Sequence, residues 1–175
     1  MKTVKRISEF GKAVDFVRGI KTDVIVADIA TDHGYLAEYL SKQSWVKKVV
    51  ASDISKRCLD KVIKLIETNN LKNIETIVGD GLIPLEKVDI SVIAGVGGWE
   101  IIKMLKTQNA MANGDNKCDV FVLQPAQNVV ELREWLFDNE IFVIKDYVIE
   151  DAERFYPIII VDVSKKQSNE KSVYN

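Results

Sequence analysis

The sequence is poor in the residues on which disulfide frameworks and metal sites are built. Its 175 residues include two cysteines and one histidine. Cys58 and Cys118 lie far apart with no paired spacing, which fits a reducing compartment and offers neither a zinc site nor a disulfide pattern. We therefore expect buried or incidental thiols, no bound metal, and a lone histidine, His33, without partners at metal-ligand spacing.

Long apolar runs and a strong excess of one charge are also missing. The N-terminus, MKTVKRISEF, is charged and lacks the apolar core of a signal peptide, and no stretch approaches membrane-spanning length. The formal net charge is −2, so overall charge does not point to a nucleic-acid partner, although a local basic face would be compatible with one. We expect a cytoplasmic protein with no membrane partner. The oligomeric state is not defined by the sequence, and a monomer is the simplest expectation.

Apolar residues are plentiful and evenly spread. They make up 47% of the chain, which is enough to bury one sizeable core, and there are no internal repeats. Residues 108–117 form a polar segment that we predict to be a loop, and residues 164–175 form a polar tail with nothing to bury. We therefore expect one domain over residues 1–163.

Short runs rich in Val and Ile alternate with segments of helical periodicity. Nearly continuous apolar runs of this kind predict strands that are covered on both faces, as in a parallel sheet. Ser55 is placed to cap one intervening helix, and Asn128, with Glu131 three residues later, is placed to cap another. The predicted strands are Val24–Asp28, Val49–Asp53, Ile74–Val78, Ile90–Ala94 and Val120–Gln124.

The alternation stops near the C-terminus. Ile141–Ile149 and Tyr156–Val163 are separated by six residues, too few for a crossover helix, so they should pair as an antiparallel hairpin. A dehydrogenase-type fold would more often continue to a sixth parallel strand. The pattern therefore predicts an α/β, Rossmann-like fold of the class I methyltransferases that use S-adenosylmethionine (SAM), with a mostly parallel seven-stranded sheet and a C-terminal antiparallel hairpin.

Carboxylates follow three of the predicted strands. The carboxyl ends of parallel strands meet at one edge, so Asp28, Asp53 and Asp80 should converge on one crevice. Asp53 lies at the spacing from Asp28 at which an acidic residue reaches ribose hydroxyls, the alternative being a helix cap. Asp80 with Gly81 suits contact with an adenine, the alternative being a simple turn.

The stretch VADIATDHGYLAEYL, residues 26–40, follows the first strand without the usual glycines. Its two carboxylates would repel a pyrophosphate but suit the sulfonium and ammonium of SAM. Asp28 should orient the loop or meet the amino-acid part of SAM, and Asp32 should lie farther out, beside a substrate base. The alternatives are that Asp32 caps the helix starting near Gly34 and that His33 is a structural hydrogen-bonding residue rather than a ligand contact.

Glycines follow the fourth strand in the stretch IAGVGGWEI. Gly95, Gly97 and Gly98 either admit a flat base or a sulfonium against the backbone or make only a tight turn before a helix that starts near Trp99.

Taken in order, these blocks resemble a known family. VADIATDHGYLAEYL, GDGL, IAGVGG, LQPAQNVVELREWL and ERFYPIIIV are similar to the bacterial tRNA (adenine(22)-N1)-methyltransferases of the TrmK type, over about residues 5–163. The resemblance implies a SAM-dependent enzyme that methylates N1 of an adenine in tRNA, with Asp32 important for activity. It places Asp28, Asp53, Asp80, Gly81 and Gly95 where cofactor-binding residues are expected. We expect Ala30, His33 and Ile54, which neighbour them in the sequence, to bind the cofactor as well.

The chain departs from that family at three points. Ala30 stands where the family usually has Gly, and Val96 where it usually has Met. Family members commonly carry a helical C-terminal domain thought to help hold tRNA, whereas this chain ends in a polar tail. We expect either a catalytic domain alone or a naturally short member, with tRNA affinity reduced accordingly.

Two further questions stay open at the level of sequence. One is the RNA surface, for which the candidates are cations that could equally be solvated: Lys2, Lys5, Arg6, Arg18, Lys21, Arg133 and Arg154. Trp99, Trp135 and Phe155 are expected to pack in the core or hairpin rather than stack on bases. The other is the activity, with methylation of another substrate or a noncatalytic SAM-binding module for RNA or a partner as alternatives. A dinucleotide oxidoreductase is disfavoured because the first turn lacks G-x-G-x-x-G.

Overall fold

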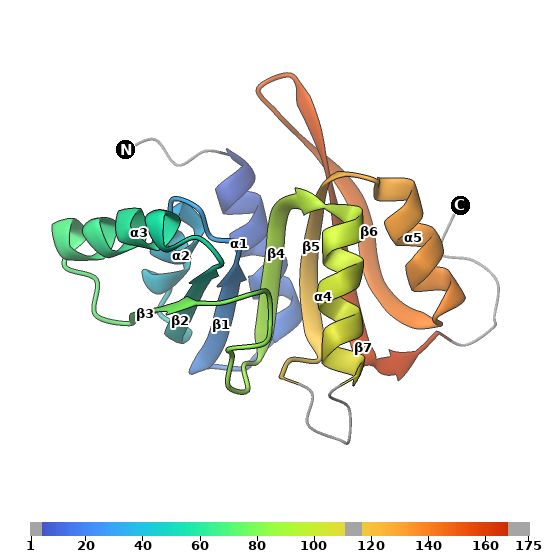
Figure 1. Ribbon diagram of the computed structural model, residues 1–175, viewed down its shortest axis with the longest axis horizontal. Helices are drawn as coiled ribbons and strands as arrows, with labels where there is room; N and C mark the ends of the chain where they lie inside the picture. Colours follow the sequence, from blue (N-terminus) through green and yellow to red (C-terminus); the bar gives the residue numbers. More distant parts are fainter. Residues whose placement is uncertain (1–4, 111–116, 168–175) are drawn as a thin grey trace.

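The computed structural model describes residues 5–110 and 117–167 and shows a seven-stranded sheet with helices packed on both faces (Figure 1). The predicted polar loop and polar tail are each partly wrong: residues 108–110 belong to a helix and residues 164–166 to the last strand, while residues 111–116 and 168–175 lie outside the described part of the chain. The elements in chain order are α1 Lys5–Arg18, β1 Val24–Ile29, α2 Tyr35–Ser41, β2 Val46–Asp53, α3 Lys56–Asn69, β3 Ile74–Val78, β4 Ile90–Gly97, α4 Gly98–Ala110, β5 Val120–Gln127, α5 Val129–Asp138, β6 Ile141–Asp151 and β7 Arg154–Lys166.

The sheet has the strand order β3-β2-β1-β4-β5-β7-β6. All pairs from β3 to β5 are parallel, whereas β7 is antiparallel to both β5 and β6. The five predicted parallel strands and the C-terminal hairpin are therefore confirmed. The strand order reverses between β1 and β4, and such a switch point is where open α/β sheets bind ligands.

The β6–β7 hairpin is longer than its apolar pattern predicts. Its strands run to Asp151 and from Arg154, so only Ala152 and Glu153 form the turn. Both turn residues have left-handed backbones, with φ of 50° and 61°, the geometry that matches the twist of paired strands. Figure 1 shows the hairpin tip projecting beyond the rest of the sheet.

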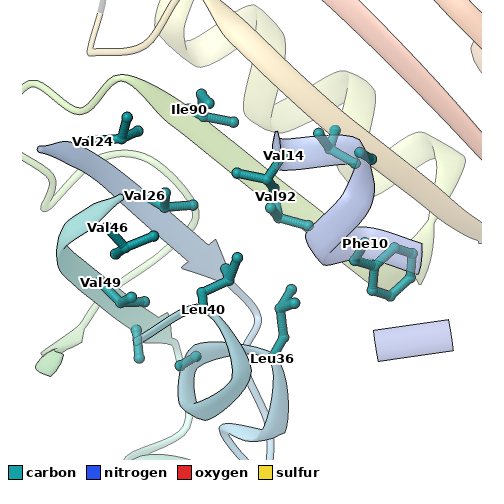
Figure 2. Packing of buried hydrophobic residues seen from close by; sticks show 14 of the residues in the cluster. Phe10, Val14, Val24, Val26, Leu36, Leu40, Val46, Val49, Ile90 and Val92 are labelled. Carbon is teal, nitrogen blue, oxygen red and sulfur yellow. The ribbon is translucent and has the colours of Figure 1, made fainter. Parts of the chain in front are cut away.

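Two apolar clusters cover the two faces of the sheet. The first joins α1, α2 and α3 to one face and includes Val62 of α3. Figure 2 shows Phe10 and Leu36 among its buried side chains. The second joins α4 and α5 to the other face. Alternation along β1 divides its side chains between them, because Val24 and Val26 enter the first cluster and Ala27 and Ile29 enter the second.

The two predicted helix caps have different outcomes. Ser55 is the N-cap of α3, and its side chain accepts a hydrogen bond from the Cys58 amide, as predicted. Asn128 is at the N-cap of α5, but its side chain makes no cap hydrogen bond. Its backbone is left-handed, with φ of 57°, instead of the extended form of ordinary N-caps, and its amide donates to Glu131 Oε1 at 3.3 Å.

Within residues 5–110 and 117–167, no helix is both long and apolar enough to cross a membrane.

Candidate functional site

A crevice runs along the carboxyl ends of the parallel strands. It consists of two adjoining cavities of about 520 and 240 Å³, which share Ala30, Asp53 and Val96 in their linings. The larger cavity lies over β1 and β4, and the smaller one extends over β2 and the end of β3. The position matches the strand-order switch point between β1 and β4.

All nine residues that the sequence nominates line this crevice. Residues from the ends of four different strands are thus brought together, as the strand-end argument predicts. The larger cavity is lined by Asp28, Ala30, Asp32, His33, Asp53 and Gly95, and the smaller one by Ala30, Asp53, Ile54, Asp80 and Gly81. Their roles in binding or catalysis stay predictions.

Asp28 is the most buried carboxylate of the crevice. Only 4% of the residue is exposed, and the Thr31 hydroxyl donates to Oδ2 at 2.6 Å. Burial raises the pKa of Asp28 to about 6, against the opposing effect of the Thr31 hydrogen bond. A buried carboxylate that is costly to ionise beside a cavity is suited to pairing with a cationic group.

Asp53 joins the end of β2 to the loop after β1. Its Oδ2 accepts from the Asp32 amide at 3.2 Å, and its Oδ1 accepts from the Ser55 amide at 2.8 Å. Ser55, not Asp53, caps α3, so the helix-cap alternative for Asp53 is wrong. A carboxylate has about four acceptor sites, which leaves two for a ligand such as a diol.

Asp32 lies at the mouth of the crevice within a polar cluster. Its Oδ2 is 2.6 Å from His33 Nδ1, and its Oδ1 is 3.2 Å from Lys61 Nζ and 3.6 Å from Cys58 Sγ. Lys61 Nζ also lies 3.4 Å from His33 Nε2. Partial burial alone would raise the pKa of Asp32, but the hydrogen bonds and charges of Lys61 and His33 outweigh it and hold that pKa below its usual range.

The capping alternative for Asp32 is also wrong. Helix α2 begins at Tyr35, and its N-cap residue is Gly34, with φ of 74° and no side-chain cap. The Asp32 side chain is 58% exposed and turns toward α3 instead. His33 stacks on Tyr35, with ring centroids 5.5 Å apart and planes 9° from parallel, so a flat aromatic pair stands next to the Asp32 carboxylate.

The loop after β1 has an unusual backbone that the sequence does not reveal. Ala30, Asp32 and Gly34 all have positive φ, at 58°, 49° and 74°. A non-glycine residue in this region costs roughly 1–2 kcal/mol, so the backbone of Ala30 is strained. The alternating conformation turns the amide of Asp32 toward Asp53 and its side chain toward Lys61.

The smaller cavity holds the predicted adenine contacts. Gly81 has φ of 56°, and a Cβ there would lie 2.9 Å from Met104 Cγ, so the close approach of α4 requires glycine. Asp80 lies at the rim with Lys103 Nζ 3.8 Å from its Oδ2. Asp80 and Gly81, whose backbone is left-handed, therefore lie together in the turn that follows β3.

Several residues of the crevice are not predicted from the sequence to bind the cofactor or to act in catalysis. Arg6 from α1, Thr31, Cys58 and Gln124 line the larger cavity, and Lys61 from α3 contacts Asp32. Long-range packing brings α1 and α3 there, so no local spacing marks them. Cys58 was expected to be incidental but lies in the site.

Burial confirms the predictions for the second thiol and for one of the three large aromatic residues, and contradicts them for the other two. Cys118 is buried, and burial raises the pKa of its thiol to about 12, in keeping with an unreactive residue. Trp135 packs against the second core cluster as expected. Trp99 and Phe155 are 57% and 72% exposed, so the prediction that they pack in the core or hairpin is wrong. Trp99 lies at the start of α4 and Phe155 at the tip of the hairpin, and both positions are outside the core.

No group of three or more His, Cys, Asp or Glu side chains suited to a metal ion occurs among the residues that the structure describes.

The parallel sheet with its antiparallel hairpin and strand-end crevice has the architecture of a class I methyltransferase. A family of methyltransferase domains matches residues 12–159, and the chain belongs to this family. A putative tRNA methyltransferase of Mycoplasma genitalium is 36% identical over 146 residues, which cover 81% of this chain and 63% of that protein. The tRNA (adenine(22)-N(1))-methyltransferase of Bacillus subtilis is 26% identical over 152 residues, covering 85% and 63% of the two chains. The chain thus spans just under two thirds of the length of these relatives.

Solved structures agree with these relatives. Mycoplasma capricolum TrmK in complex with S-adenosyl-homocysteine superposes with a TM-score of 0.78 at 25% identity, over 96% of this chain and 72% of that one. A putative tRNA (m1A22) methyltransferase from Streptococcus pneumoniae, in complex with S-adenosyl-L-methionine, has a TM-score of 0.76 at 25% identity, over 92% and 75%. The resemblance inferred from the motifs is therefore confirmed.

Proposed function

We propose that the chain is a SAM-dependent methyltransferase domain that transfers a methyl group to N1 of an adenine in tRNA, at position 22. The observation that carries the proposal is the acidic strand-end crevice with Asp32 at its mouth. The names of the relatives supply the substrate class and the position. We further propose that it acts in the cytoplasm, where tRNA is found, and as a monomer, because one chain supplies every residue named above.

The crevice fits SAM in size and charge. Its volume lies in the range of small-molecule sites. The larger cavity is lined by the carboxylates of Asp28, Asp32 and Asp53 against one guanidinium, that of Arg6, which favours a cationic ligand over a phosphate. Gly95 has φ of 78° and open space where a Cβ would stand, so the backbone there is accessible to a ligand.

We assign the binding roles along the crevice from the geometry. Asp28, buried and inclined to hold a proton, would ionise against the ammonium or sulfonium of SAM. Asp53 would use its two remaining acceptor sites for the ribose hydroxyls. Ile54, Asp80 and Gly81 would enclose the adenine of the cofactor, and Ala30, His33 and Gly95 would contact its central part. When bound, SAM supplies an electrophilic methyl group.

Asp32 would act on the substrate base. Adenine N1 already has a lone pair, so bond formation to the methyl carbon requires alignment more than a base. The adenine becomes cationic as N1 is methylated, and a carboxylate that accepts from its N6 amino group stabilises that charge. Lys61 and His33 favour the ionised form of Asp32 that this role requires.

The walls of the larger cavity suit a base that has left its stack. Ile7, Phe10 and Leu36 form an apolar side, and the stacked rings of His33 and Tyr35 lie next to Asp32. An extruded base is held by such apolar and aromatic walls together with a few polar contacts.

The test is methylation of unmodified total tRNA with labelled SAM, followed by mapping of the modified nucleoside. We expect 1-methyladenosine at position 22, and a transcript with guanosine at that position should accept no label. Label at another nucleoside, or in protein, would replace the proposed substrate. Binding of SAM without transfer to any tRNA would indicate a noncatalytic module.

A further inference from the structure

The cations that the sequence nominates for RNA binding are largely engaged within the protein. Arg18 pairs with Asp15 at 2.6 Å and stacks on Trp45, with 4.7 Å from Cζ to the ring centre. Lys21 pairs with Asp89. Each of these pairs would have to be broken or shared before a phosphate could bind.

Two other nominated cations are also engaged. Arg133 makes two hydrogen bonds of 2.8 Å to Asp146. Arg6 lies with its guanidinium 4.7 Å from the Tyr156 ring and lines the crevice itself. Lys2 is outside the described residues. Lys5 and Arg154 are exposed and remain candidates, but the other nominated cations within the described part of the chain are engaged.

Helix α3 carries a row of cations on its outer face. Arg57, Lys61 and Lys64 are spaced i, i+4, i+7, so they lie on one side of the helix, and all three are exposed. The buried residues of α3, Leu59 and Val62, lie on the opposite side, against the sheet. We call this row the α3 basic ridge.

The middle of the ridge lies beside the candidate site. Its middle member, Lys61, places Nζ 3.2 Å from Asp32 Oδ1 and 3.4 Å from His33 Nε2. The ridge extends about 10 Å along the helix axis, as seven residues at 1.5 Å each require. Lys56 at the start of α3 is paired with Asp60 at 2.9 Å and does not belong to it. Within the described part of the chain, neither Arg57 nor Lys64 has a carboxylate partner.

We propose that the α3 basic ridge binds the sugar-phosphate backbone of the RNA strand next to the target adenosine. This inference rests on the proposed function. Lys61 lies closest to the base and is shared between Asp32 and the backbone, while Arg57 and Lys64 contact flanking phosphates. Such contacts set the position and orientation of an RNA strand and leave sequence reading to other groups. Because the net charge is −2, attraction of a polyanion has to come from local groups of cations such as this ridge.

The test uses the two outer members and leaves Lys61, the partner of Asp32, unchanged. The double variant Arg57→Gln/Lys64→Gln is compared with Lys47→Gln/Lys87→Gln, in which two exposed lysines are removed at the amino ends of β2 and β4, on the opposite edge of the sheet. Both variants take the net charge from −2 to −4. The affinity for a labelled, unmodified tRNA transcript is measured by fluorescence anisotropy at several salt concentrations.

Losing two phosphate contacts to a single strand should reduce the slope of log affinity against log salt by about 1.4. The loss of affinity between 50 and 200 mM salt then becomes about sevenfold smaller in the ridge variant, whereas the control double variant keeps the wild-type slope. SAM affinity should be unchanged in both. Equal slopes and affinities for the two double variants would overturn the ridge.

Failure of the proposed function looks different. If the wild type transfers no methyl group to tRNA but the ridge variant alone loses RNA affinity and salt dependence, the ridge stands and the activity falls. If the wild type methylates tRNA and the ridge variant matches the control in affinity, slope and rate at low tRNA concentration, the activity stands and the ridge falls.

Discussion

Burial of Asp28 makes its ionised carboxylate costly in the free protein, and a bound cationic ligand would offset that cost. Its pKa is raised to about 6 by burial, above an ordinary value near 3.9 in the unfolded chain. The folded protein therefore binds more protons than the unfolded chain between those two pKa values, so this group's contribution to stability falls as pH rises through that window and stays low above it. Ionised Asp28 should be a net cost at neutral pH.

Asp28→Asn removes that cost and keeps an acceptor oxygen for Thr31. Above pH 7 the variant should be more stable than the wild type by on the order of 3 kcal/mol, as two pKa units imply, and the difference should vanish near pH 4. Urea unfolding at pH 7.5 and pH 4 measures both values. A wild type that is the more stable of the two at pH 7.5 would show that Asp28 already has a compensating partner.

Asp53 serves the fold and the proposed ligand with the same carboxylate. Asp53→Ala removes the acceptor for the Asp32 and Ser55 amides as well as the proposed ribose contact. SAM affinity should fall by about 1.5–3 kcal/mol, the scale of hydrogen bonds to a charged group. Calorimetric titration with SAM measures this loss, and Ser55→Ala, which loosens the same α3 start without touching the ligand contact, is the matched control. Unchanged affinity in folded Asp53→Ala protein would remove the ribose assignment.

At the scale of elements, the turn from β1 to α2 decides where the proposed catalytic groups stand. Gly34 has φ of 74°, and a Cβ there would lie 2.9 Å from Val62 Cγ1 on α3. Alanine at this position would be strained in its backbone and would also push α2 and α3 apart. The spacing between Asp32 and Lys61 depends on the same contact.

Gly34→Ala should therefore destabilise the protein by roughly 1–3 kcal/mol, combining left-handed strain with overpacking. Thermal unfolding measures this, and Gly19→Ala is the control because Gly19 is also left-handed, with φ of 58°, but has nothing within 4 Å of its Cβ position. Gly34→Ala should cost clearly more than Gly19→Ala. Equal losses would mean that the contact with α3 yields easily.

The sequence predicts elements well where the signal is local. The parallel strands follow from their apolar runs, the hairpin from its short connection, and the Ser55 cap from its position before α3. The Asn128 cap fails because the Asn128 backbone is left-handed, with φ of 57°; this residue also lies close to Gly98, where a Cβ would stand 2.2 Å from the Asn128 carbonyl oxygen. That contact belongs to the packing of α4 against the start of α5, which no local pattern encodes.

In the candidate site, too, the residues placed by strand ends are predictable from the sequence and those placed by long-range packing are not. Asp28, Asp53 and Asp80 are predictable because parallel strands end at one edge. Lys61 reaches Asp32 from 29 positions along the chain. Ala30 and Asp32 have positive φ without being glycines, and the Asp32 amide donates to Asp53 at the end of the neighbouring strand.

At the scale of the whole molecule, the strand order places binding and reaction at one edge. The reversal between β1 and β4 opens the crevice, α1 and α2 close one side of it, and α3 carries the basic ridge to its mouth. The chain spans just under two thirds of the length of the Mycoplasma genitalium and Bacillus subtilis relatives, and the nine nominated residues of the crevice and the ridge all lie within residues 12–159, which match the methyltransferase family.

The most direct test of this account is the single-turnover rate of methyl transfer by Asp32→Asn to a tRNA transcript, compared with the wild type. The variant keeps the size and one acceptor oxygen but loses the charge that should stabilise the methylated base, so its rate should fall about 100- to 1000-fold. SAM affinity and melting temperature, measured on the same samples, should be nearly unchanged because the side chain lies at the mouth of the crevice. A near-wild-type rate for folded, SAM-binding Asp32→Asn would contradict the account and leave Asp32 only a partner of His33 and Lys61.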